Sequence, residues 1–124
     1  MPAVAPGWEL DVERGPGWLL VKIRHPLADA SDLPPLADEV WSLLERHFTY
    51  RVVLELDEVE LLYSYLLGQF VVLGRRIRQR DGMMRLCGLS PYNQEVLHTH
   101  GLDSRLPAYD DVEEAVMGAK RKPR

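Results

Sequence analysis

The strongest constraint on the fold is the alternation of short apolar runs with longer segments that carry apolar residues at helical spacing. Residues 51–56 are apolar and rich in valine and leucine, which predicts a central strand buried on both faces. Residues 64–80 follow with an apolar helical stripe, and the same change from strand to helix recurs further along the chain. Strands that alternate with helices pair in parallel through right-handed crossovers. The chain is therefore predicted to be an α/β domain with a mostly parallel sheet.

Turn and capping signals supply the other elements. Gly15-Pro16-Gly17 predicts a tight turn, and Asp110 and Glu113, three residues apart, resemble a capping box at the start of a terminal helix. The expected order is an antiparallel hairpin of 8–13 and 18–23, helix 36–47 behind Pro34-Pro35, strand 51–56, helix 64–80, strand 83–87, a helix capped by Ser90 before Pro91 and ended by Gly101, an extended segment or strand at 102–109, and the terminal helix.

Length and composition set the domain organisation. A chain of 124 residues with 46% hydrophobic residues has one core, so we expect a single domain over residues 1–119 and a flexible basic tail at 120–124. The lone Cys87 forms no internal disulfide, no secretory signal is recognised, and the longest apolar stretches are too short to span a membrane. These features predict a cytoplasmic protein.

The charge balance argues against nucleic-acid and anionic-lipid partners. The formal net charge is −4, so the molecule as a whole repels polyanions. A local exception is an arginine cluster that has no aromatic residues interleaved for stacking on bases, and we interpret it as charge that offsets the negative end of a helix dipole. The cluster comprises Arg75, Arg76, Arg78 and Arg80.

No grouping of residues in the sequence predicts catalysis, a cofactor or a metal. His98 and His100 are two residues apart, point in different directions on a helix, and have no further ligands at metal spacing. Cys87 lies in an apolar strand, where a thiol is buried with a raised pKa. Asp57, Glu58 and Glu60 are most simply a strand exit into a solvated loop, and no phosphate-binding glycine loop occurs. The protein is predicted to be no enzyme.

Ser64 is the residue most suited to regulation. It lies between a buried strand and a helix, at the carboxyl end of the predicted sheet. A phosphate there would add nearly two negative charges beside free backbone amides and repel a bound partner. The alternative is that the Ser64 side chain only caps the helix.

From strand 51–56 onward the sequence resembles the STAS domains of bacterial anti-sigma factor antagonists. In that family a strand of alternating hydrophobic and Asp or Asn character leads through a loop into a stretch close to Asp-Ser-Ser-Gly-Leu-Gly. Residues 54–57 correspond to the strand, Ser64 falls at the regulatory serine, and Leu67-Gly68 at the closing Leu-Gly. The resemblance continues through residues 75–82, 85–91, 96–97, 101–103 and 109–115, and covers the N-terminal third only in element order.

The resemblance implies a fold, a partner and a site. The fold is a mostly parallel sheet with an N-terminal hairpin and about four helices packed mainly on one face. The partner is an anti-sigma factor, which in the family includes a serine-kinase type that phosphorylates the serine and so breaks the complex. Carried onto this chain, Ser64 is the phosphoacceptor, and the docking surface comprises Asp57, Glu58, Tyr63, Ser64, Tyr65, Leu66 and Gly68.

The chain departs from the family pattern around the serine. Tyr63 replaces the usual acidic residue, and Tyr65-Leu66 replaces the usual Ser-Gly, so the approach of a kinase to the backbone is altered and an apolar docking patch is an alternative. The Gly-Glu-Leu-Asp-like stretch is replaced by residues 24–27. A divergent scaffold or accessory subunit without phosphorylation is therefore a second reading, and nucleotide or small-molecule binding is a third without a supporting motif. The hairpin leaves a sheet edge that allows a homodimer.

Overall fold

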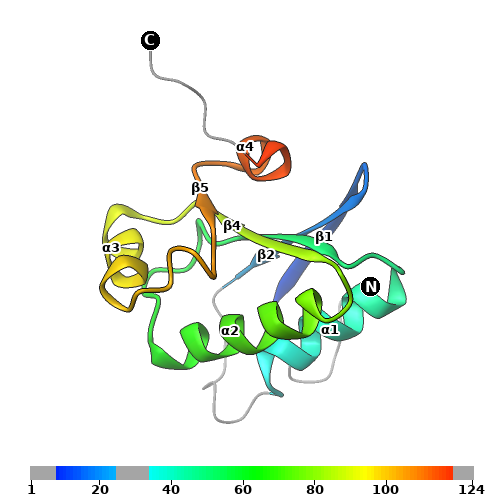
Figure 1. Cartoon of the computed structure of the whole chain (residues 1–124), viewed down its shortest axis with the longest axis horizontal. Coiled ribbons are helices and arrows are strands. Elements are labelled where there is room, and N and C mark those ends of the chain that lie inside the picture. Colours follow the sequence, from blue (N-terminus) through cyan, green and yellow to red (C-terminus); the bar gives the residue numbers. More distant parts are fainter. Residues whose placement is uncertain (1–7, 25–33, 119–124) are drawn as a thin grey trace.

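The computed structural model describes residues 8–24 and 34–118, which form a five-stranded sheet and four helices (Figure 1). The predicted basic tail at 120–124 and most of the divergent stretch 24–27 lie outside these residues. In the described part of the chain, no helix has the length and apolar character to cross a bilayer. The elements are β1 (Leu10–Gly15), β2 (Trp18–Ile23), α1 (Leu36–Arg46), β3 (Arg51–Glu55), α2 (Ser64–Arg78), β4 (Met83–Cys87), α3 (Pro91–Thr99), β5 (Ala108–Tyr109) and α4 (Val112–Met117).

The strands lie in the sheet in their order along the chain. β1 pairs antiparallel with β2, and each later strand pairs in parallel with the one before it. Because successive right-handed crossovers all step in one direction, their helices must lie on one face. Helices α1, α2 and α3 accordingly cover that face, and α4 lies against the other (Figure 1). The predicted mixed α/β sheet with a hairpin and four helices is confirmed.

The central strand β3 contributes to both faces of the sheet. Val52 and Leu54 pack in the large core beneath α1, α2 and α3, which includes the fully buried Phe70. Val53 points to the opposite face, where it packs with Trp18, Cys87 and Ala115 under α4. The prediction that this strand is buried on both sides is confirmed.

Several predicted boundaries move. The expected strand at 102–109 is reduced to Ala108–Tyr109, because the chain before it forms local turns, with Leu106 N donating to Leu102 O at 2.8 Å. The capping box lies one residue later than predicted. Asp111 Oδ1 accepts from Glu114 N at 2.9 Å, and Glu114 Oε1 accepts from Asp110 N at 3.3 Å.

Candidate functional site

The predicted site lies on the loop that joins β3 to α2, at the end of the sheet where the parallel strands finish. We call this end, with the loops that follow β3 and β5, the carboxyl end. The loop begins with Leu56, whose N–H donates to Cys87 O at 2.9 Å, so it leaves the sheet in register with the end of β4. Gly88 lies against it with a φ of +77°, and a Cβ there would lie 3.1 Å from Asp57 N. The start of the loop is therefore fixed by close backbone contact.

A buried side chain from α3 fixes the rest of the loop. Asn93 is 0% exposed. Its Oδ1 accepts from Leu62 N at 3.0 Å, and its Nδ2 donates to Val59 O at 3.1 Å and to Glu60 O at 3.3 Å. One amide thus satisfies three backbone groups of the loop. We infer that Asn93 sets the path that brings the chain to Ser64.

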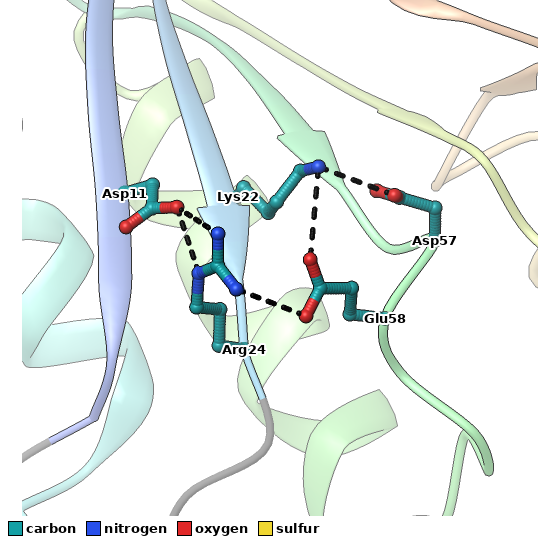
Figure 2. Close-up of polar contacts among 5 residues, drawn as sticks. All are labelled: Asp11, Lys22, Arg24, Asp57 and Glu58. Carbon is teal, nitrogen blue, oxygen red and sulfur yellow. Dashed lines mark hydrogen bonds and ion pairs between the residues drawn. The ribbon is translucent and has the colours of Figure 1, made fainter.

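Five charged residues form an ion-pair network beside this loop (Figure 2). Lys22 Nζ lies 3.2 Å from Asp57 Oδ2 and 3.8 Å from Glu58 Oε2. Arg24 bridges Glu58 Oε1 at 3.2 Å and Asp11 Oδ2 at 2.7 Å. The hydrogen bond to Asp57 raises the pKa of Lys22, and the hydrogen bond to Asp11 raises that of Arg24. Asp57 and Glu58 are therefore not simply solvated, as the sequence suggested, but tie the loop to β2.

Ser64 is the first residue of α2, and its side chain is exposed. The N-cap position belongs to Tyr63, which provides no side-chain acceptor, and no acidic residue lies in the first turn. The first described backbone bond of the helix is Leu67 N to Tyr63 O at 3.1 Å. The alternative in which Ser64 caps α2 is therefore wrong, because the hydroxyl lies one position too late to act as the cap.

Tyr65 supports the neighbouring helix. Helix α1 follows Pro35, which has no capping side chain, and its first amides find acceptors on α2. Leu36 N donates to Tyr65 Oη at 3.4 Å, and Ala37 N donates to Gln69 Oε1 at 2.8 Å. The Tyr65 ring also stacks on Trp8, with centroids 6.2 Å apart. Tyr65, which stands where the family pattern has a small residue, therefore binds the start of α1 and packs on Trp8.

The other predicted surface residues divide into exposed and buried. Tyr63 is 39% exposed, and a Cβ on the exposed Gly68 would meet nothing within 4 Å. Leu66 is only 3% exposed and packs in the core, so the structure excludes its side chain from the surface. The exposed Leu61, at 51%, was missed by the sequence analysis, although an apolar residue in a polar loop is a usable signal.

The histidines and the cysteine of the described residues do not come together in one cluster. No group of three or more metal-ligating side chains occurs in this part of the chain. His98 Nδ1 lies 3.0 Å from Asp103 Oδ2, whereas His100 Nδ1 lies 2.9 Å from Val96 O, so the two rings have separate partners. Burial raises the pKa of the Cys87 thiol to about 12, which leaves it un-ionised at neutral pH.

A family model matches the part of the chain that forms this sheet and its helices. The model is described as STAS domain and matches residues 9–115. The chain belongs to the STAS domain family. A search of curated proteins finds no match.

Solved structures share the STAS fold at low sequence identity. An anti-sigma factor antagonist from Mycobacterium paratuberculosis is 20% identical, with a TM-score of 0.73 over 90% of this chain and 93% of that one. The Bacillus cell fate determinant SpoIIAA, in its phosphorylated form, is 14% identical, with a TM-score of 0.64 over 89% and 98%. A chain of the stressosome, a signal integration and transduction hub, is 16% identical, with a TM-score of 0.66 over 87% and 94%.

Proposed function

We propose that this STAS domain is a non-enzymatic binding protein that antagonises an anti-sigma factor, and that phosphorylation of Ser64 ends the interaction. The observation that carries the proposal is the exposed Ser64 hydroxyl at the uncapped start of α2, which makes no hydrogen bond within the described part of the chain. A phosphorylated form of the structurally similar SpoIIAA supports it.

The start of α2 tolerates a phosphate within this fold. The N-cap residue Tyr63 offers no side-chain acceptor to the N–H groups of the first turn, and the positive end of the helix dipole lies there. A phosphate on Ser64 would add about −1.5 to −2 charge at that point. The added charge disrupts a docked surface by desolvation and by repulsion of acidic groups on the partner, while the domain itself stays folded.

The docking surface lies around Ser64 on exposed side chains. We assign it to Leu61, Tyr63, Ser64 and Gly68, with Asp57 and Glu58 at its margin. Tyr63 and Leu61 supply the apolar and aromatic contact that is common at the centres of protein interfaces. Gly68 lies one turn beyond Ser64 and leaves room for close approach of a partner.

The test is the affinity of charge variants for the partner recovered with the wild-type chain from its native cells. Ser64→Asp is expected to weaken binding at least about tenfold, and Ser64→Ala to leave it unchanged. Ser90→Asp is the matched control, because it adds the same charge at the start of α3 while an N-cap acceptor is retained. Equal affinity of Ser64→Asp and Ser64→Ala would refute the switch.

The second candidate is a scaffold subunit without phosphorylation. The fold shared with a stressosome chain favours it, as does Tyr63, a bulky side chain immediately before Ser64. Mass spectrometry of the protein from its native cells separates the two functions. A phosphate on Ser64 supports the switch, whereas an unmodified Ser64 in a stable complex with a partner that is not a kinase supports the scaffold.

A further inference from the structure

The two ends of the sheet carry opposite charge. We call the end where β2, β3 and β4 begin, and where α1 and α2 finish, the amino end (Figure 1). Its cations are Arg14, Arg46, Arg51, Arg75, Arg76, Arg78 and Arg80, against the carboxylates of Glu13, Asp38, Glu45 and Asp81. The carboxyl end carries Lys22 and Arg24 against Asp11, Glu55, Asp57, Glu58, Glu60, Asp110, Asp111 and Glu113. The formal charge of −4 thus conceals a strong polarity along the strands.

Aromatic rings hold part of the amino-end charge in place. The Arg76 guanidinium lies 4.7 Å from the centroid of the Trp41 ring, and that of Arg80 lies 4.9 Å from the centroid of the Tyr50 ring. The two rings contact each other, with centroids 5.5 Å apart. Arg76 also pairs with Asp38 at 2.8 Å. Planar cations stacked on fixed rings lose little freedom when they meet carboxylates.

Phe48 adds an exposed aromatic side chain at the same end. It occupies the turn after α1 with a φ of +53°, a conformation that favours glycine or asparagine, and it is 88% exposed. Thr49 N donates to Leu44 O at 3.1 Å and closes the helix in the manner of a Schellman motif. Neither burial nor backbone preference in the single chain accounts for a phenylalanine here.

The carboxyl end offers a complementary surface. A hollow of about 420 Å³ lies between the ends of β3 and β4 and the start of α4. Cys87 and Val112 line it together with five carboxylate-bearing residues from the end of β3, the loop after it, the loop after β5 and the start of α4: Glu55, Asp57, Asp110, Asp111 and Glu113. We call these five residues the acidic rim. The acidic rim and the arginine cluster lie at opposite ends of the same strands.

We infer that the chain associates head to tail, with the amino end of one copy against the carboxyl end of a second copy. Charge complementarity favours a second copy of this chain as the partner, because the acidic carboxyl end of one copy can pair with the arginine-rich amino end of another. The lateral edge is less suited to pairing, since β1 exposes Asp11, Glu13 and Arg14 along its length. A head-to-tail contact is heterologous, so it leaves one end of each type available for further copies.

The inference has a consequence for the proposed function but does not depend on it. Ser64 and the loop before it also lie at the carboxyl end. A second copy seated there would compete with an anti-sigma factor, so that release of single copies would precede partner binding.

The experiment is sedimentation velocity of the purified chain alone, so failure of the proposed function cannot affect it. We expect a concentration-dependent increase in sedimentation coefficient at low NaCl that is lost at high NaCl, because exposed charges are screened. Arg78→Glu/Arg80→Glu removes the net positive charge of the amino end, and Glu60→Lys/Asp110→Lys removes more than half of the net negative charge of the carboxyl end. Each double variant alone should be monomeric, with an unchanged circular dichroism spectrum.

Mixing the two double variants is the decisive measurement. Each retains one intact end, and the intact ends are complementary, so the mixture should form a one-to-one dimer that does not grow further. A wild-type chain that is monomeric at low NaCl, or a mixture that stays monomeric while the wild type associates, would overturn the inference.

Phe48→Gly tests the contribution of the exposed aromatic side chain. The melting temperature should rise as strain is relieved, while the affinity between copies weakens at least about tenfold. Unchanged association of Phe48→Gly would exclude Phe48 from the contact.

Discussion

Helices α2 and α3 both begin beside a serine, and they use it in opposite ways. Ser90 precedes α3 with extended backbone, and its Oγ accepts from Asn93 N at 3.1 Å. Ser64 is already inside α2, and its hydroxyl makes no hydrogen bond to any described residue. One serine completes a helix end, whereas the other leaves a helix end open.

The difference arises from the residue beside each serine. Pro91 is well suited to the first helical position, so Ser90 is held at the N-cap. At α2 the extended residue is Tyr63, with a ψ of 171°, and Ser64 falls one position later. A shift of one residue therefore separates a stabilising hydroxyl from one that is available for modification.

The largest expected effect on stability is at Asn93, which lies in α3 but holds the loop that leads into α2. Asn93→Ala leaves three loop backbone groups without their partner and opens a cavity, so we expect a loss of about 3 kcal/mol in the free energy of unfolding. Denaturant titration measures it. Gln94→Ala, an exposed amide one residue along, is the control and should cost much less. A loss at Asn93 no larger than at Gln94 would contradict the assignment of Asn93 to the loop.

An intermediate effect is expected at Ser90. Ser90→Ala removes the acceptor of Asn93 N and should lower the free energy of unfolding by about 1 kcal/mol. Ser90→Asp, which keeps an acceptor at the N-cap, should restore most of that loss. If Ser90→Ala unfolds at the same denaturant concentration as the wild type, the hydroxyl is not needed to cap α3.

The smallest effect is expected at Ser64. Ser64→Ala should change the free energy of unfolding by less than about 0.5 kcal/mol, because it removes an exposed hydroxyl that makes no hydrogen bond to any described residue. The same denaturant titration serves, with Ser90→Ala as the reference. A loss at Ser64 as large as that at Ser90 would mean that both hydroxyls cap their helices and that the contrast between the two helix starts does not hold.

Local signals in the sequence predicted the element order and the Ser90 cap. Apolar periodicity records which face of each element is buried, and Ser-Pro fixes a helix start within two residues. The capping box of α4 was misplaced because Asp110 and Glu113 have the same spacing as Asp111 and Glu114. Only the packing of α4 distinguishes the two pairs.

Contacts between distant residues could not be predicted. Tyr65 meets Leu36 N across a separation of 29 residues, and Asn93 meets Leu62 N across 31. Neither residue carries a mark of its partner in the sequence. No aromatic residue is interleaved in the arginine cluster, and the stacking of Arg76 on Trp41 could not be predicted either, because Trp41 lies on another helix and reaches Arg76 only through tertiary packing.

The placement of the three tryptophans makes the chain its own optical reporter. Trp8 stacks on Tyr65, whose neighbour is Ser64, Trp18 lies within 5.0 Å of the Arg85 guanidinium on the α4 face, and Trp41 lies beneath Arg76 at the amino end. Trp8 and Trp18 are buried, and each of the three indoles lies close to a different surface of the molecule. Variants that retain a single tryptophan would show, from the fluorescence that changes, which surface a partner or a second copy has covered.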